Sequence, residues 1–383
     1  MYKPYETTFR GQRMTIKEKL MNISFWYVFF ICLLAAIGVT MLYSAANGHW
    51  QPWAINQLLR FGVGFGVMIF FALIDIRIIL RYSYLFYFFT LILLLVVEVT
   101  GHIGMGAQRW INFGFFKLQP SELMKIALVL VLARYFHSTQ LQTIESTSGM
   151  IKPALLALIP AGLIIVQPDL GTGLMLIMTT TAIFFAVGVQ MWKFVAVGIT
   201  GIILAPIAWH FLHDYQKDRV LTFLNPERDP LGAGYHIIQS KIALGSGGVF
   251  GKGFLKGTQT HLNFLPEKHT DFIFCTIGEE DGFVGAVIVL LLMGALILRI
   301  MGMGDRQQEP FGRVYCYCVA AILLFHTLVN VGMTMGIVPV MGIPLPFISY
   351  GGSSLVAFTI LVFVAFALDA STRKGLPVYG IRR

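Results

Sequence analysis

Long apolar segments recur along the whole chain, and they constrain its fold more than any other feature. The hydrocarbon core of a membrane is about 30 Å thick, and a helix of about 20 mostly apolar residues spans it. The sequence therefore predicts an all-α polytopic membrane protein with about ten transmembrane helices. The ten segments are Ser24–Ala45, Gln57–Ile74, Tyr82–Val99, Ser121–His137, Pro153–Val166, Gly171–Val187, Trp192–Leu212, Thr276–Met301, Val314–Gly336 and Ser353–Leu368.

The composition agrees with a lipid environment. Only 12% of the 383 residues are charged and 56% are apolar, whereas about 25% of the residues in a soluble domain are charged. The net charge of +9 does not indicate a nucleic-acid partner, because the basic residues lie at segment ends and in short loops. Their distribution is instead typical of charges that orient a membrane protein.

Basic residues of short loops collect on the cytoplasmic side of a membrane. With the N-terminus inside, that side receives 17 of the 28 Lys and Arg residues, and an even number of spans places both termini there. We expect a cytoplasmic N-terminal segment (1–23), one transmembrane domain (24–372) and a cytoplasmic tail (373–383). The first apolar segment has no small-residue cleavage site after it, so it is expected to be a retained anchor.

The longest connection, 213–275, lies between the seventh and eighth spans and is expected outside the cytoplasm. It contains a turn at Asn225–Pro230 and then a surface helix at Gly234–Leu244. The glycine-rich run Gly245–Gly253 differs from a nucleotide-binding loop, because Gly253 stands where Ser or Thr would bind magnesium. We interpret this run as a surface turn and expect no nucleotide cofactor.

Charged residues also occur at or inside the predicted spans near the outer side. Glu122 and Lys125 are three residues apart and share one face of a helix. Ionisable groups at membrane depth are costly and usually face a bundle interior or a wet cavity. They are either a structural pair that joins helices or part of a binding site, and the nearby Arg109 favours the site.

Two further outer segments border the same region. Asp169, in Gln167–Thr172, either caps the sixth helix or lines a cavity. The Pro- and Gly-rich segment Pro339–Ser354 is not helical in pattern, and such backbone is tolerated at membrane depth only where it lines a cavity or is buried in protein. We expect this segment to form a wall.

Asp271 is the strongest candidate for a catalytic residue. It stands where a polar loop meets an apolar run that starts at Phe272. A carboxylate at such an edge is partly desolvated, which raises its pKa and makes it a competent base. The alternative is an aspartate that caps the following helix.

These clusters all fall on the outer side, so they predict a single site, and no ATP-binding motif supplies it with energy. A group transfer there needs an activated substrate. A lipid-linked sugar pyrophosphate fits, because it carries a good leaving group and an anionic head that suits Arg109 and Lys125.

Several motifs resemble those of the SEDS (shape, elongation, division and sporulation) family over about 24–373, and Asp229–His236 is similar to the elongation branch rather than the division branch. The motifs are Gly106–Trp110, Gln119–Glu122, Gln167–Thr172, Asp229–His236, Phe264–Glu267, His269–Phe272, Pro344–Pro346 and Tyr350–Ser353.

The resemblance implies ten helices, a large outer loop and processive joining of lipid II disaccharides. It also implies that the chain acts together with a class B penicillin-binding transpeptidase and other elongation-complex membrane proteins. The family's essential acid corresponds to Asp271. The chain departs from the family after that motif, because Cys275 and Asp281 stand where small and aliphatic residues are usual.

The expected function is therefore a glycosyltransferase that makes β-1,4 glycan from lipid II at the periplasmic face of the bacterial cytoplasmic (inner) membrane. Asp271 is the expected general base. Arg109 and Lys125 are expected to bind pyrophosphate, helped by Mg²⁺ or Mn²⁺, with Glu122 orienting Lys125 and Asp169 on the cavity wall. The alternative is a lipid II flippase, which would need polar groups along a path through the membrane.

Overall fold

The computed structural model describes residues 25–73, 76–100, 102–104, 107–112, 114, 117–139, 146–212, 214–229, 232–265 and 267–373. Ten helices of 17 to 25 residues occur in this part of the chain, one for each predicted segment. They are α2 (Phe25–Ala45), α3 (Ala54–Leu73), α4 (Ile76–Thr100), α5 (Pro120–Ser138), α7 (Thr147–Val166), α8 (Leu170–Ala186), α9 (Met191–Phe211), α14 (Gly282–Arg306), α15 (Pro310–Thr334) and α16 (Ser353–Arg373).

Six of these helices, namely α2, α4, α7, α14, α15 and α16, are long and apolar enough to cross a membrane, and α8 and α9 are shorter apolar helices. Large apolar side chains cover their outer faces: Val99 is 82% exposed and Leu298 is 67% exposed. Such surface is stable only in contact with lipid or protein. The chain is a multi-pass membrane protein, as predicted.

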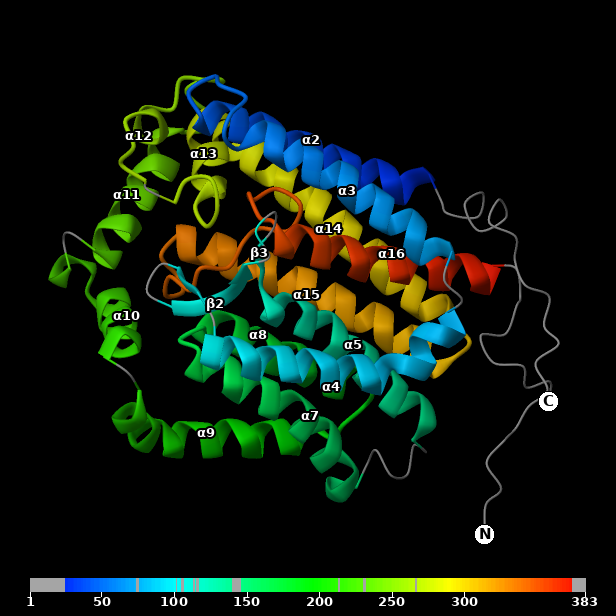
Figure 1. The fold of residues 1–383 in the computed structure, drawn as a ribbon. Coiled ribbons are helices and arrows are strands. Elements are labelled where there is room, and N and C mark those ends of the chain that lie inside the picture. Colours follow the sequence, from blue (N-terminus) through cyan, green and yellow to red (C-terminus); the bar gives the residue numbers. More distant parts are fainter. Residues whose placement is uncertain are drawn as a thin grey trace, which may run out of the picture.

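Helices α5, α15 and α16 form the centre of the bundle, and most of their residues are buried. Around them, α4 packs on α5, α14 on α15, and α3 on α16 (Figure 1). By contrast, α9 lies at the lower edge of Figure 1 and exposes apolar side chains such as Val197 and Ile202 around most of its circumference. The central helices therefore position the polar groups described below.

A small antiparallel sheet interrupts the helical pattern between α4 and α5. Its strands β1 (His102–Gly104), β2 (Ala107–Asn112) and β3 (Lys117–Leu118) pair in the order β1-β2-β3. No strand was expected here from the sequence, since such short strands carry little periodicity. The sheet fixes the position of Arg109, which lies on β2.

The long connection between α9 and α14 is mostly structured. It contains α10 (Asp214–Leu224), η1 (Pro226–Arg228), α11 (Ala233–Ser246), α12 (Thr258–His261) and α13 (Ile273–Glu280). The expected surface helix is confirmed as α11. The expected eighth span is divided instead, because α13 ends at Glu280 and α14 begins at Gly282 (φ 70°). A Cβ atom at Gly282 would lie 2.2 Å from the backbone nitrogen of Gly251, so only glycine fits.

Candidate functional site

Asp271 lies in a tight turn that leads into α13. The Glu267 carbonyl accepts hydrogen bonds from the backbone N–H groups of Thr270 (3.2 Å) and Phe272 (3.1 Å). The residue before α13 is Phe272, and no side chain caps that helix. The alternative that Asp271 is a helix cap is therefore wrong, and its carboxylate is available for another role.

Three hydrogen bonds attach this turn to the Pro- and Gly-rich segment Pro339–Ser354 and to α15. Asn330 Nδ2 donates to the Asp271 carbonyl (3.0 Å), Ser349 Oγ donates to the Thr270 carbonyl (2.7 Å), and the Tyr350 N–H donates to the His269 carbonyl (2.8 Å). These bonds fix the backbone on both sides of the carboxylate. The position of the Asp271 carboxylate is therefore set by the fold.

The Pro- and Gly-rich segment borders the Asp271 carboxylate, as the wall interpretation requires. A Cβ atom at Gly342 would lie 3.4 Å from Asp271 Oδ2, and Gly342 has a φ of 70°. A glycine here keeps the backbone close to the carboxylate without covering it. Asn330 Nδ2 also donates to the Ile343 carbonyl (2.7 Å), which ties this wall to the same asparagine that holds the turn.

Burial raises the pKa of Asp271 to about 7, and the negative charge of Glu267 adds to the increase. Among the weaker influences on this pKa, Arg219 and Arg109 lower it and Asp169 raises it. Asp271 as a whole residue is only partly buried. A carboxyl group with a pKa near neutrality is well matched to proton transfer at physiological pH.

Arg109 and Asp169 come together beside this turn. Arg109 Nε lies 3.9 Å from Asp169 Oδ2, and the guanidinium also donates to the carbonyls of Gln167 and Pro168. Asp169 accepts hydrogen bonds from the Thr172 N–H (3.2 Å) and hydroxyl (3.0 Å), so it caps α8 as well. The position of Asp169 is thus compatible with both roles considered for it, a cap of α8 and a residue on the cavity wall.

Glu122 and Lys125 form a closed pair on α5. Lys125 Nζ lies 2.8 and 2.7 Å from the two Glu122 oxygens and 3.3 Å from His326 Nε2. Lys125 is only 2% exposed, and its ammonium lies 5.1 Å from the centre of the Phe358 ring. In this arrangement Lys125 faces protein groups on all sides, which favours the structural alternative for the pair.

His326 and Asn330 connect this buried pair to the Asp271 turn. They are one turn apart on α15, and His326 Nδ1 lies 3.2 Å from the Pro344 carbonyl, next to the Ile343 carbonyl that Asn330 binds. His326 was not predictable from the sequence, because a histidine in an apolar run gives no sign of its partner. Arg219 was not predictable either, because a lone arginine in a long connection has no distinguishing pattern.

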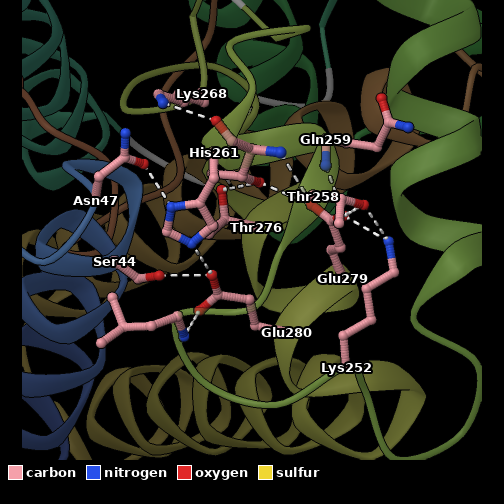
Figure 2. Close-up of polar contacts among 12 residues, drawn as sticks. Ser44, Asn47, Lys252, Thr258, Gln259, His261, Lys268, Thr276, Glu279 and Glu280 are labelled. Atoms are coloured by element: carbon pink, nitrogen blue, oxygen red, sulfur yellow. Dashed lines mark hydrogen bonds and ion pairs between the residues drawn. The ribbon is translucent and has the colours of Figure 1, made fainter.

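Glu279 and Glu280, which follow Asp271 in the chain, take part in hydrogen bonds that stabilise the fold. Figure 2 shows Glu279 accepting from Lys252 Nζ (2.8 Å) and from the segment 258–260, and Glu280 accepting from Ser44 and His261. Although burial disfavours its charge, these hydrogen bonds hold the pKa of Glu279 below its ordinary value. Within the described ranges, no three metal-binding side chains are grouped.

Comparison with known proteins gives one consistent result. The chain is 44% identical to the peptidoglycan glycosyltransferase MrdB of Escherichia coli strain K12 over 331 residues, which cover 85% of this chain and 89% of that protein. It is 39% identical to the probable peptidoglycan glycosyltransferase FtsW of Aliivibrio salmonicida, over 77% and 74% of the two chains.

Solved structures agree with the sequence relatives. The fold matches a chain of a peptidoglycan synthase complex described as coordinating polymerization and crosslinking, with a TM-score of 0.78, 33% identity and coverage of 91% and 98%. It also matches the rod shape determining protein RodA of Thermus thermophilus, with a TM-score of 0.69, 27% identity and coverage of 91% and 97%. The model of the FtsW, RodA and SpoVE family of cell cycle proteins matches residues 19–374, and this chain belongs to that family.

Proposed function

We infer that this chain is a peptidoglycan glycosyltransferase that polymerises lipid II into β-1,4 glycan strands during cell elongation. The names of its relatives MrdB and FtsW support the activity. The inference rests on the Asp271 turn, where a partly exposed residue has a carboxyl pKa of about 7 and lies within electrostatic range of Arg109. A base next to a cation is the combination that sugar transfer from a diphosphate carrier needs.

In the proposed reaction, Asp271 accepts the proton of the acceptor sugar's 4-hydroxyl group. The hydroxyl oxygen attacks the anomeric carbon of the donor, and the bond between that carbon and the carrier's diphosphate oxygen breaks. One glycosidic bond forms, and undecaprenyl diphosphate leaves. The glycan grows while linked to undecaprenyl pyrophosphate, so the donor and the acceptor both bring a diphosphate to the site.

Arg109 is the proposed contact for this diphosphate, because its guanidinium can bind two phosphate oxygens at once. In the bound state it would exchange its carbonyl partners at Gln167 and Pro168 for the phosphate. Lys125, which is buried against Glu122 and His326, is proposed as a positioning residue that supports the wall through the contact of His326 with Pro344. Asp169 holds Arg109 at its place on the cavity wall.

We also propose that Mg²⁺ or Mn²⁺ assists binding of the diphosphate. Mg²⁺ is commonly held by one or two carboxylates together with substrate phosphates. Glu267 would supply such a carboxylate, because its charge already acts on the neighbouring Asp271, which stays free to accept the proton. When bound, the cation would neutralise charge on the leaving diphosphate. Polymerisation that continues at full rate in EDTA would contradict this proposal.

The proposed location is the bacterial inner membrane, with both termini in the cytoplasm and the site facing the periplasm. In this arrangement 24–372 form one transmembrane domain between two cytoplasmic segments. The proposed partners are a class B penicillin-binding transpeptidase and other elongation-complex membrane proteins, and no nucleic acid. The likeness to a synthase complex that combines polymerization and crosslinking supports the first of these.

The activity is tested with the purified full chain and its transpeptidase partner, supplied with fluorescent lipid II. We expect glycan ladders on a gel. In parallel, the same preparation in vesicles is assayed for exchange of lipid II between leaflets. Leaflet exchange without polymer would overturn the glycosyltransferase inference and establish the flippase.

A further inference from the structure

Arg60 is a charged residue on α3, in a segment predicted to span the membrane, and the proposed reaction does not use it. It is the seventh residue of α3, so it lies about 9 Å along the helix from Ala54 at a rise of about 1.5 Å per residue. Its neighbours Leu59 and Val63 are 63% and 60% exposed, which places this side of α3 against lipid. A cation at such a position is costly unless a partner neutralises it.

The protein gives Arg60 an aromatic partner but no anionic one. The guanidinium carbon lies 4.2 Å from the centre of the Tyr350 ring, and Arg60 Nη1 is buried without a hydrogen-bond acceptor. Among the residues that the structure describes, no Asp or Glu oxygen lies within 4.0 Å of this guanidinium. Stacking on an aromatic ring compensates a charge only in part.

Arg60 also lies close to the N-terminus of α16. A Cβ atom at Gly352 would lie 3.7 Å from the Arg60 guanidinium carbon, so the guanidinium packs against the residue that precedes α16.

We propose that Arg60 binds the phosphate group of a membrane lipid where α3 meets α16. The phosphate would supply the missing acceptors and neutralise the guanidinium, and its acyl or prenyl chain would lie along Leu59 and Val63. Arginine suits this role because it binds phosphate oxygens in pairs. The phosphate belongs either to an anionic glycerophospholipid or to a polyprenyl phosphate.

This site is joined to the Asp271 turn. Tyr350, on which Arg60 stacks, donates its N–H to the His269 carbonyl (2.8 Å), and the adjacent Ser349 hydroxyl donates to the Thr270 carbonyl (2.7 Å). Gln57, one turn before Arg60, donates to the Ser349 carbonyl (2.9 Å). A lipid bound at Arg60 therefore contacts the same segment that holds the catalytic turn.

The test measures lipid binding by the purified full chain, so its outcome does not depend on the proposed activity. Native mass spectrometry in detergent titrates wild type and variants with three probes: phosphatidylglycerol, undecaprenyl phosphate, and diacylglycerol, which has no phosphate. The variants are Arg60→Met, Arg60→Lys and, as a matched control, Arg299→Met, which removes an exposed arginine from α14.

We expect Arg60→Met to bind at least one phosphate lipid about tenfold more weakly than wild type, which is the loss expected for a charge-assisted contact. Arg60→Lys should retain part of the binding, and it remains the test if Arg60→Met does not fold. The probe that is lost identifies the source of the phosphate. Unchanged binding of both phosphate lipids, an equal loss for diacylglycerol, or an equal loss in Arg299→Met would overturn the proposal.

Discussion

At the scale of single residues, the chemistry depends on one carboxyl whose surroundings oppose its ionisation. Asp271 is held by backbone hydrogen bonds on both sides, and burial together with Glu267 raises its pKa to about 7. Arg109 and Arg219 act in the opposite direction. Charges of both signs therefore set the pKa of Asp271. A measurement of its protonation tests its role as a base.

The rate of polymerisation should follow the ionisation of Asp271. A base must be deprotonated, so kcat/KM should rise about tenfold per pH unit below pH 7 and level off above it. Glu267→Gln removes the neighbouring negative charge and should move the midpoint to lower pH, whereas the exposed control Glu227→Gln should not move it. A profile that stays flat from pH 5 to 8 would exclude Asp271 as the base.

The buried pair on α5 gives a second residue-level prediction. Lys125→Met leaves the Glu122 carboxylate buried without its partner and should destabilise the protein by about 3–5 kcal/mol. The double variant Glu122→Gln/Lys125→Met has no buried charge at this position and should recover most of that loss. Thermal unfolding of the purified variants measures both effects.

The same double variant separates the two roles of Lys125. A positioning role predicts a lower kcat with an unchanged KM for lipid II, because ground-state binding is not affected. If the KM for lipid II rises about tenfold or more in the double variant, Lys125 contacts the pyrophosphate directly. The assignment of that contact to Arg109 alone would then be wrong.

The sequence predicted part of the site because some residues carry a pattern of their own. Asp271 was identifiable from its place between a polar loop and an apolar run, and the structure brings Arg109 and Asp169 towards it. His326 and Arg219 were not identifiable, because their roles depend on contacts with distant segments. The closed state of Lys125 also depends on such contacts, so a spacing of three residues could not show it.

At the scale of helices and strands, the length of the apolar segments decides most of the fold. About 20 apolar residues leave a chain few choices in lipid, since every backbone group must be paired within the segment. All ten helices were therefore predictable. The β1–β3 sheet and the break before Gly282 were not, because they depend on pairing and on a close approach to Gly251 that no local pattern records.

The break between α13 and α14 is stabilised by two buried acids, which leads to a stability prediction. Glu279→Gln removes the charge that binds Lys252 and should lower the free energy of unfolding by about 1.5–3 kcal/mol. The exposed control Glu227→Gln should change it by less than about 0.5 kcal/mol. Equal thermal stability of the two variants would show that the network in Figure 2 contributes nothing.

The pH dependence of this network has a definite sign. The pKa of Glu279 is lowered in the folded protein, so its contribution is fully present above the ordinary carboxyl pKa. It is lost as the pH falls through the lowered value. The stability difference between wild type and Glu279→Gln should therefore shrink in strongly acidic buffer and stay constant around neutrality.

At the scale of the whole molecule, orientation decides whether the site can meet its substrate. The excess of Lys and Arg in alternate short loops predicts cytoplasmic termini and a periplasmic 213–275 segment. In intact spheroplasts, an impermeant thiol reagent should label a cysteine at Asn225 and leave one at Gln308 unlabelled. Both positions are exposed, whereas the adjacent Gln307 is only 1% exposed. The reverse labelling would contradict the orientation.

The assignment of Asp271 as the base of a glycan polymerase is tested by comparing two variants with the wild type. Purified wild type, Asp271→Asn and the control Asp214→Asn, each with its transpeptidase partner, are given fluorescent lipid II at equal concentration. Asn has nearly the shape of Asp but cannot accept the proton, so Asp271→Asn should lower turnover by about 10²–10⁴-fold at normal expression and partner binding. Asp214→Asn, at an exposed position on α10, should polymerise as wild type does. Glycan ladders from Asp271→Asn at the wild-type rate would contradict the account.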